Sequence, residues 1–271
     1  MAYAVSTWNT LKPFGERARL APAVRGLVES GLGVELWLGW TAEPLLMRRD
    51  NWPALRDLVR GAPSLSAHSA LIHHFDLDTL KEEIDLCAFL GPDPLVVHPR
   101  SLGFEAGTWD ATFAAGRLTD DEQRRLSAIC TYARERSVRL ALENGPMDLL
   151  RLALEAAATL PDGESLGICV DTGHANLHHA FYPEPSVAFL QAFSRRLVHF
   201  HVSDNRGGED EHKNPGTGTV DWRAAMTALA GTGYRGPVVL ELWYDDPEPA
   251  AREAMAYLDG VQSRIAGRGR G

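Results

Sequence analysis

The stretch Leu166-Gly-Ile-Cys-Val-Asp171 is a short apolar run that ends in a carboxylate, and Thr172-Gly-His174 follows it directly. An apolar run of this length is typical of a β-strand that is buried on both faces. Strands of this kind belong to parallel sheets whose faces are covered by helices. The stretch therefore indicates an α/β fold in which Asp171 stands at the carboxyl end of a buried strand.

The same pattern recurs on both sides of this stretch. Seven further runs rich in Val, Ile and Leu are expected to form strands: residues 3–8, 33–38, 65–69, 95–99, 139–144, 197–203 and 238–242. Segments with helical periodicity separate them, among them 80–90 and 248–265, and further helices are expected to begin at the capping box Thr119-Asp-Asp-Glu122 and at Asp221. Eight strand–helix units in 271 residues predict a single (β/α)8 TIM barrel, which typically has about 250 residues.

The composition is that of an ordinary globular protein, with 45% hydrophobic residues. The chain has no apolar stretch long enough to span a membrane and no signal-peptide pattern at its N-terminus, and its net charge of −9 disfavours nucleic acid as a partner. Three widely spaced cysteines are expected to be reduced. We therefore expect a cytoplasmic protein with one domain over residues 1–271, in which 266–271 form a frayed tail.

Polar residues gather at the ends of the predicted strands. Seven strands end in, or lead directly into, a residue that can bind a metal ion or transfer a proton: Glu35, His68, His98, Glu143, Asp171, His201 and Glu241. In a barrel the carboxyl ends of the strands converge on one mouth, so these side chains are expected to meet there. A carboxylate at the end of a buried strand is costly unless it is paired or bound to a cation. Glu35 could instead be only a structural partner for an arginine at the barrel mouth.

Four of these residues are predicted to bind a divalent metal ion: Glu143, Asp171, His201 and Glu241. Carboxylates and one imidazole suit Mn²⁺, Mg²⁺, Co²⁺ or Zn²⁺. Asp171 could instead cap the following helix. Strand alternation places His199 and His201 on one face, and His201 is the better ligand because it is nearer the mouth, whereas His199 is expected to be a hydrogen-bonded core residue.

Other residues near the predicted mouth allow more than one role. His174 could contact the substrate, bind the metal or support a ligand, and His68 and His98 could be substrate contacts or metal ligands. Trp8 and Trp243 stand at strand ends and could either pack in the core or form aromatic walls around a sugar.

The loop Glu209-Asp-Glu-His-Lys-Asn-Pro-Gly-Thr-Gly218 contains two further candidate ligands, Asp210 and His212. A polar loop of this kind is usually solvated surface. Its glycines Gly216 and Gly218, however, would also allow a tight path back over the mouth of the barrel. Both interpretations remain open on the sequence.

Four motifs carry a resemblance to a known family: Leu140-Ala-Leu-Glu-Asn144, Val170-Asp-Thr-Gly-His174, His201-Val-Ser-Asp-Asn205 and Val239-Leu-Glu241. With their order along the chain, they resemble the xylose isomerase-like TIM-barrel superfamily. In its sugar isomerase and epimerase branch, the matching Glu, Asp, His and Glu bind one divalent ion, and the two glutamates flank the reacting carbon. The resemblance also implies that His174 and Arg206 position substrate oxygens.

The resemblance implies a metal-dependent isomerase or epimerase that acts on a sugar or related polyol. The ion would stabilise an enediolate while Glu143 and Glu241 act as the catalytic acid and base. Return of the proton to the opposite face gives epimerisation, and return to the neighbouring carbon gives isomerisation. Relatives often pair through loops at the mouth, so a homo-oligomer is compatible with this resemblance.

Two alternatives stay open. Endonuclease IV-type relatives cleave DNA at abasic sites with three zinc ions, and all nine of their ligands have a match here: His68, His98, Glu143, Asp171, His174, His201, Asp210, His212 and Glu241. The acidic segment Ser203-Asp-Asn-Arg-Gly-Gly-Glu-Asp210 disfavours phosphate binding, so sugar chemistry is preferred. The other alternative is a non-catalytic barrel that only binds a ligand, and the full set of acid–base residues speaks against it.

Overall fold

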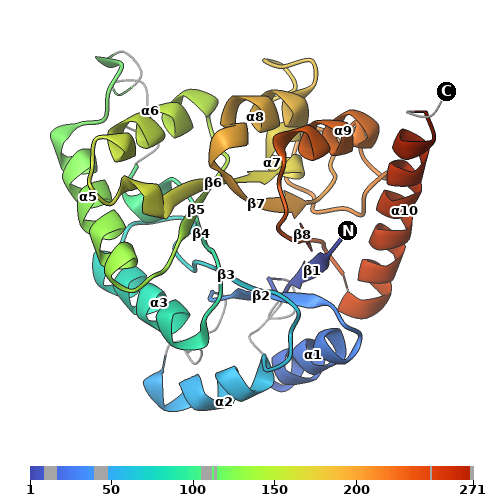
Figure 1. Ribbon diagram of the computed structural model, residues 1–271, viewed down its shortest axis with the longest axis horizontal. Helices are drawn as coiled ribbons and strands as arrows, with labels where there is room; N and C mark the ends of the chain where they lie inside the picture. Colours follow the sequence, from blue (N-terminus) through green and yellow to red (C-terminus); the bar gives the residue numbers. More distant parts are fainter. Residues whose placement is uncertain (9–16, 40–47, 105–111, 113–114, 245, 269–271) are drawn as a thin grey trace.

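The chain forms a closed barrel of parallel strands in the computed structural model, which describes residues 1–8, 17–39, 48–104, 112, 115–244 and 246–268. The strands are β1 Tyr3–Ser6, β2 Gly33–Trp37, β3 Leu65–His68, β4 Leu95–Val97, β5 Leu140–Glu143, β6 Leu166–Asp171, β7 Leu197–Val202 and β8 Val238–Leu240. Each strand pairs with the next and β8 pairs with β1 (Figure 1). The predicted (β/α)8 fold is thus confirmed, with several strands shorter at their ends than expected.

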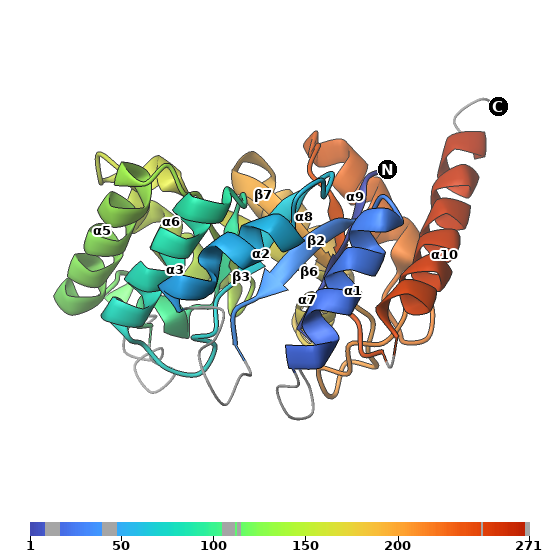
Figure 2. The ribbon, with the colours of Figure 1, turned by 90° about the horizontal axis from the view of Figure 1, so that it is seen from below.

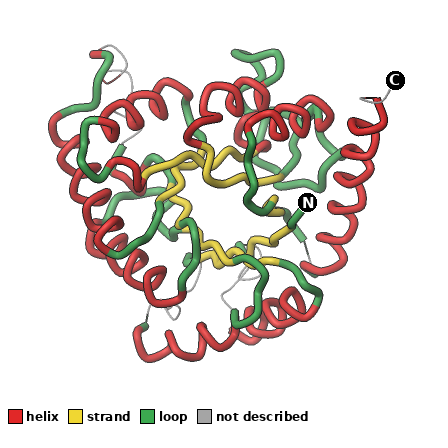
Figure 3. The backbone as a smooth tube through the Cα atoms, viewed as in Figure 1, coloured by secondary structure: helices red, strands yellow, loops and turns green. Residues whose placement is uncertain are grey.

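Helices surround the barrel as an outer ring (Figure 3). The α-helices are α1 Arg17–Glu29, α2 Trp52–Leu58, α3 Leu77–Leu90, α5 Asp120–Glu135, α6 Met147–Ala158, α7 Thr172–Asn176, α8 Pro185–Phe193, α9 Trp222–Thr232 and α10 Pro247–Arg268. Short 3₁₀ turns lie at η1 Arg49–Asn51, η2 Arg100–Leu102, η4 Gly163–Ser165 and η5 Ser194–Arg196. Seen from below, α1, α2 and α3 lie in front of strands β2 and β3 (Figure 2).

Local sequence signals account for the helix ends. The capping box predicted at Thr119 is present: the Thr119 side chain accepts from the Glu122 backbone N–H, and the Glu122 side chain accepts from the Thr119 backbone N–H. Asp221 caps α9, since its side chain accepts from the backbone of Ala224 at 2.9 Å. Helix α10 continues to Arg268, so residues 266–268 of the expected tail are helical, and 269–271 lie outside the described residues.

The strands alternate between two environments. Ile168 and Val170 of β6 belong to the large apolar core between barrel and helices. Cys169 instead packs with Val96 and Ala141 in a small separate cluster. Because side chains alternate along a strand, the neighbours of Cys169 on its face include Asp171, one step closer to the mouth. Inward-facing residues at the strand ends, such as Asp171, therefore lie at the mouth of the barrel.

None of the helices in the described part of the chain is long and apolar enough to cross a membrane.

Candidate metal centre at the barrel mouth

Four side chains from neighbouring strands converge at the mouth: Glu143 at the end of β5, Asp171 at the end of β6, His201 in β7 and Glu241 directly after β8. We call these residues the quartet. One ligand atom from each lies within 4.8 Å of those of the others, and all four residues are buried. His201 Nδ1 is 2.8 Å from Glu143 Oε1 and 3.0 Å from Glu241 Oε2. Strand register explains the convergence, because Asp171 pairs with His201 across β6 and β7.

The quartet has the free acceptor capacity that a metal ion needs. Asp171 Oδ1 accepts from the His174 backbone at 2.7 Å, so this residue both caps α7 and faces the site. Its other oxygen, Oδ2, is buried without a hydrogen-bond partner in the described part of the chain. Burial raises the pKa of Asp171 to about 6. A buried, unpartnered carboxylate oxygen is costly, and a divalent cation would remove that cost, so these residues fit a hard or borderline metal ion.

Histidines balance the charge of the glutamates in the quartet. Burial alone would raise the pKa of Glu143, but His174, His201 and His98 hold it well below its usual range. Burial alone has the opposite effect on a histidine and would lower the pKa of His201, but the surrounding acidic groups raise it well above its usual range. Burial raises the pKa of the Cys169 thiol, which lies one step deeper than Asp171 on the same face of β6.

His68 and His98 lie on the other side of Glu143. His98 Nε2 is 2.7 Å from Glu143 Oε2, and His68 Nε2 is 3.4 Å from the same oxygen. The ligand atoms of these three residues also lie within 4.8 Å of one another. Glu143 therefore stands between two clusters, with Oε1 toward His201 and Oε2 toward the two histidines.

The loop with Asp210 and His212 folds back to the site, while Asp210 itself stays exposed to solvent. Asp210 Oδ2 lies 3.1 Å from His174 Nε2 and 2.9 Å from His212 Nε2. A backbone bridge between Asp204 and Lys213 closes the loop, and His212 Nδ1 lies 2.9 Å from the backbone oxygen of Glu241. These contacts place a third group of potential ligands beside the quartet.

Of three expected substrate contacts, Trp8 is buried, whereas Trp243 and Arg206 are exposed. Trp8 is buried, its indole N–H donates to the Leu242 backbone oxygen at 3.0 Å, and its ring lies 4.2 Å from that of His212. Trp243 contacts Trp8 edge-on at 5.6 Å and is 57% exposed, so it forms part of the rim. Arg206 is also exposed and lines two surface pockets, and neither pocket includes a member of the quartet.

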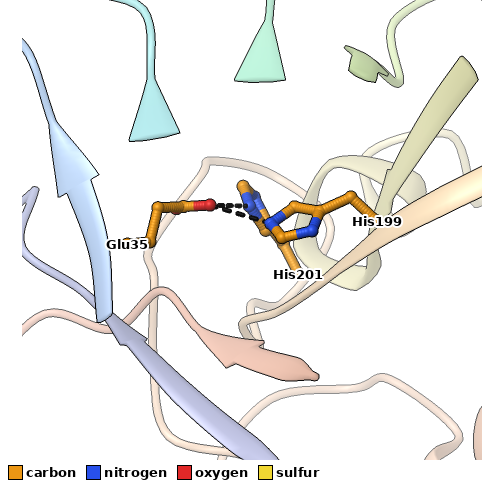
Figure 4. Close-up of side chains that lie close together, drawn as sticks. All are labelled: Glu35, His199 and His201. Carbon is orange, nitrogen blue, oxygen red and sulfur yellow. Dashed lines mark hydrogen bonds and ion pairs between the residues drawn. The ribbon is translucent and has the colours of Figure 1, made fainter. Parts of the chain in front are cut away.

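The alternative of an arginine partner for Glu35 is wrong. Glu35 Oε2 lies 2.8 Å from His199 Nε2 and 3.0 Å from His201 Nε2 (Figure 4). The same oxygen accepts from Ser66 Oγ at 3.1 Å. Strand alternation points Glu35 into the barrel toward β7, where the inward side chains are histidines. The signal was therefore present in the sequence as inward-facing polar positions on β2 and β7. His199 is, as expected, a buried hydrogen-bonded residue.

Two residues that the sequence did not single out hold the strand ends in place. The side-chain amide of Asn144 binds the backbone of Asp171 in β6. Asn144 Oδ1 accepts from the Asp171 N–H at 2.5 Å, and Asn144 Nδ2 donates to the Asp171 carbonyl oxygen at 3.1 Å. Ser203 donates to Asp171 Oδ1 at 3.2 Å. Both directly follow strands and belong to the motifs quoted above, which was the available signal.

Comparisons with curated proteins give relatives of partial coverage. The chain is 27% identical over 201 residues to the uncharacterized protein MJ1311 of Methanocaldococcus jannaschii and 30% identical over 169 residues to y4fM of Sinorhizobium fredii. These matches cover 72% and 61% of this chain, but the chain spans only 66% and 52% of the two relatives. A shorter match of 35% identity over 77 residues links 28% of the chain to 27% of L-ribulose-5-phosphate 3-epimerase UlaE of Salmonella paratyphi A.

Solved structures share the fold over nearly the whole chain. A D-tagatose 3-epimerase-like protein aligns with a TM-score of 0.73 at 20% identity, covering 98% of this chain and 100% of that one. The TTHB071 protein of Thermus thermophilus, soaked with ZnCl2, aligns with a TM-score of 0.69 at 24% identity and coverage of 97% and 99%. D-allulose 3-epimerase of Methylomonas sp., in complex with D-allulose, aligns with a TM-score of 0.67 at 16% identity and coverage of 96% and 97%.

A family model extends over most of the barrel. The model, described as a xylose isomerase-like TIM barrel, matches residues 57–261, which include every member of the quartet. It spans more than half of the chain and agrees with the closed barrel of eight parallel strands. The chain therefore belongs to the xylose isomerase-like TIM-barrel family.

Proposed function

We propose that this protein is a divalent-metal-dependent sugar epimerase or isomerase. The observation that carries the proposal is the quartet, in which two buried glutamates from β5 and β8 approach the same nitrogen of His201. Proton transfer at a carbon beside a carbonyl needs an acid–base pair and a positive charge near the carbonyl oxygen. The quartet supplies the pair and a set of ligands for the charge.

Each residue of the site has a role in this proposal. Glu143, Asp171, His201 and Glu241 hold the ion, which when bound stabilises negative charge on a substrate oxygen. One glutamate takes the proton from the carbon beside the carbonyl, and the other returns a proton to the same carbon or to its neighbour. His174, whose Nδ1 is 3.8 Å from Glu143 Oε1, would orient a substrate hydroxyl.

The names of similar proteins support a ketose as the substrate. UlaE is a 3-epimerase of a ketose phosphate, and one structure with the same fold holds D-allulose. Trp243, which is exposed at the rim beside Trp8, offers an apolar ring face on which a sugar can pack. We propose that the substrate enters past Trp243 at the rim.

The test is proton exchange. Protein stripped with chelator and reloaded with Mn²⁺, Co²⁺, Mg²⁺ or Zn²⁺ would be incubated with ketopentoses and ketohexoses in D₂O. We expect deuterium to appear at the carbon beside the carbonyl together with the epimer or isomer, and only in the metal-loaded samples. A metal-loaded protein that exchanges no proton in any ketose would contradict the proposal, and a protein that binds no metal would favour a binding function.

A second candidate function is phosphodiester hydrolysis at abasic sites with three zinc ions. The arrangement that favours it is the placement of Asp210 between His174 and His212, with His68 and His98 on the far side of Glu143. Elemental analysis of protein purified without chelator separates the two functions. About one exchangeable ion per chain supports the sugar enzyme, whereas about three tightly held zinc ions would move the search to DNA with abasic sites.

A further inference from the structure

A buried carboxylate outside the quartet contacts the far side of His201. The two ring nitrogens of His201 face opposite partners: Nδ1 faces Glu143 and Glu241, and Nε2 faces Glu35 at 3.0 Å. Glu35 comes from β2 and points toward the two histidines of β7 (Figure 4). It is fully buried. None of the roles described above uses this residue.

The hydrogen-bond geometry determines which nitrogen of His201 carries a hydrogen toward Glu35. The Glu35 side chain ends in a carboxylate, whose oxygens accept hydrogen bonds from donors on neighbouring residues. Its Oε2 accepts from Ser66 Oγ and is in hydrogen-bond range of Nε2 of His199 and of His201. His201 Nε2 must therefore donate, which leaves Nδ1 as the nitrogen that can coordinate.

We infer that Glu35 is a positioning residue of the metal centre. It accepts the Nε2 hydrogen of His201, so that Nδ1 faces the other three residues of the quartet as the ligand nitrogen. This inference rests on the metal binding in the proposed function. Without Glu35, the neighbouring glutamates would favour a hydrogen on Nδ1, where it blocks coordination, and the hydrogen on Nε2 would have no acceptor. A carboxylate behind a ligand histidine fixes the ring orientation and makes the ligand more basic.

The same three residues could also be considered as a metal site of their own, because their ligand atoms lie within 4.8 Å of one another. The quartet is the fuller site, since it offers four ligand residues with three carboxylates, whereas this cluster has three residues with one carboxylate. Glu35 Oε1 and His199 Nδ1 have no hydrogen-bond partner among the residues described.

The experiment compares Zn²⁺ and Co²⁺ binding by chelator-stripped wild type, Glu35→Ala and Glu35→Gln. We expect Glu35→Ala to bind the quartet ion on the order of 10–100-fold more weakly and to show an altered visible spectrum with Co²⁺, at unchanged stoichiometry. Glu35→Gln keeps an oxygen acceptor for Nε2 but loses the charge, so its loss should be smaller. If Glu35→Ala fails to fold, Glu35→Asp replaces it, because its shorter carboxylate cannot reach His201.

The matched control is Glu122→Gln, which alters another buried glutamate but preserves the capping box of α5. It should bind metal as the wild type does. The inference would be overturned if the Ala variant, or the Asp variant that replaces it, kept the affinity and the spectrum of the wild type. Loss of a whole metal equivalent would also overturn it, because Glu35 would then be a ligand.

The wild type separates this inference from the proposed function. If the wild type binds metal but exchanges no ketose proton, the proposed function fails and the inference stands. If the wild type binds no metal, both fail.

Discussion

At the scale of single residues, the mouth of the barrel brings several carboxylates so close together that their mutual repulsion must be balanced by positive charge. Glu143, Asp171 and Glu241 are buried side by side, and histidines provide the nearby positive charge. Removing one partner of a buried charged group leaves the other uncompensated, so substitutions here should affect binding and chemistry together.

Substitution of either quartet glutamate tests the double role that we propose. Glu241→Gln should abolish turnover and weaken metal binding, because the same carboxylate binds the ion and transfers a proton. Glu143→Gln should behave in the same way. Metal affinity by calorimetry and turnover by product analysis would be measured on the same preparations. Near-normal activity of the Glu241 variant would show that this residue has been assigned the wrong role.

His199 offers the contrasting residue on the same strand. His199→Asn removes the hydrogen bond to Glu35 and should lower the free energy of unfolding by about 1–3 kcal/mol, as expected for a buried polar group left unpaired. The metal content per chain should stay the same. Denaturant unfolding and elemental analysis check both parts. Substantial loss of metal would mean that His199, not His201, is the ligand on β7.

At the scale of elements, helix α3 holds the loop that follows β3. Glu83 on this helix is fully buried, and its carboxylate accepts from Ser69 Oγ at 2.6 Å and from the Ala70 backbone at 2.7 Å. These bonds fix the chain directly after His68. A buried carboxylate used as a structural clamp makes the attachment of this loop sensitive to pH.

The pH dependence of stability should reveal Glu83. Burial raises its pKa from 4.5 to about 7, so between these values the folded state binds more protons than the unfolded state and stability falls as pH rises. The contribution is fully present below pH 4.5 and lost by about pH 7. Glu83→Gln should remove this fall, so the difference in unfolding free energy between wild type and variant should change by on the order of 3 kcal/mol across this window. Parallel curves from denaturant titrations at several pH values would refute this prediction.

At the scale of the whole molecule, the quartet joins four consecutive strands of the barrel, from β5 to β8. The unfolded chain cannot bring residues 143 and 241 together at this geometry. An ion bound by the quartet is therefore linked to folding of the second half of the barrel.

Metal removal should lower the stability of the whole molecule. With free ion at about 100 times its Kd, the free energy of unfolding should rise by about 2.7 kcal/mol relative to chelated protein. Thermal unfolding with and without chelator, followed by circular dichroism, measures the shift. Variants that lack Glu143 or Glu241 provide the control and should respond less to chelator. Identical unfolding temperatures of wild type in both conditions would argue against a metal in the quartet.

The sequence by itself predicted the eight strands, the capping box at Thr119 and the gathering of polar residues at strand ends, because alternation and helix capping are local properties of the chain. Only the tertiary structure decided contacts between distant segments. It paired Glu35 with two histidines of β7, folded Asp210 and His212 back to the mouth, and left Arg206 exposed. The reason is that these contacts depend on how closure of the barrel brings together segments far apart in sequence, which local periodicity does not encode.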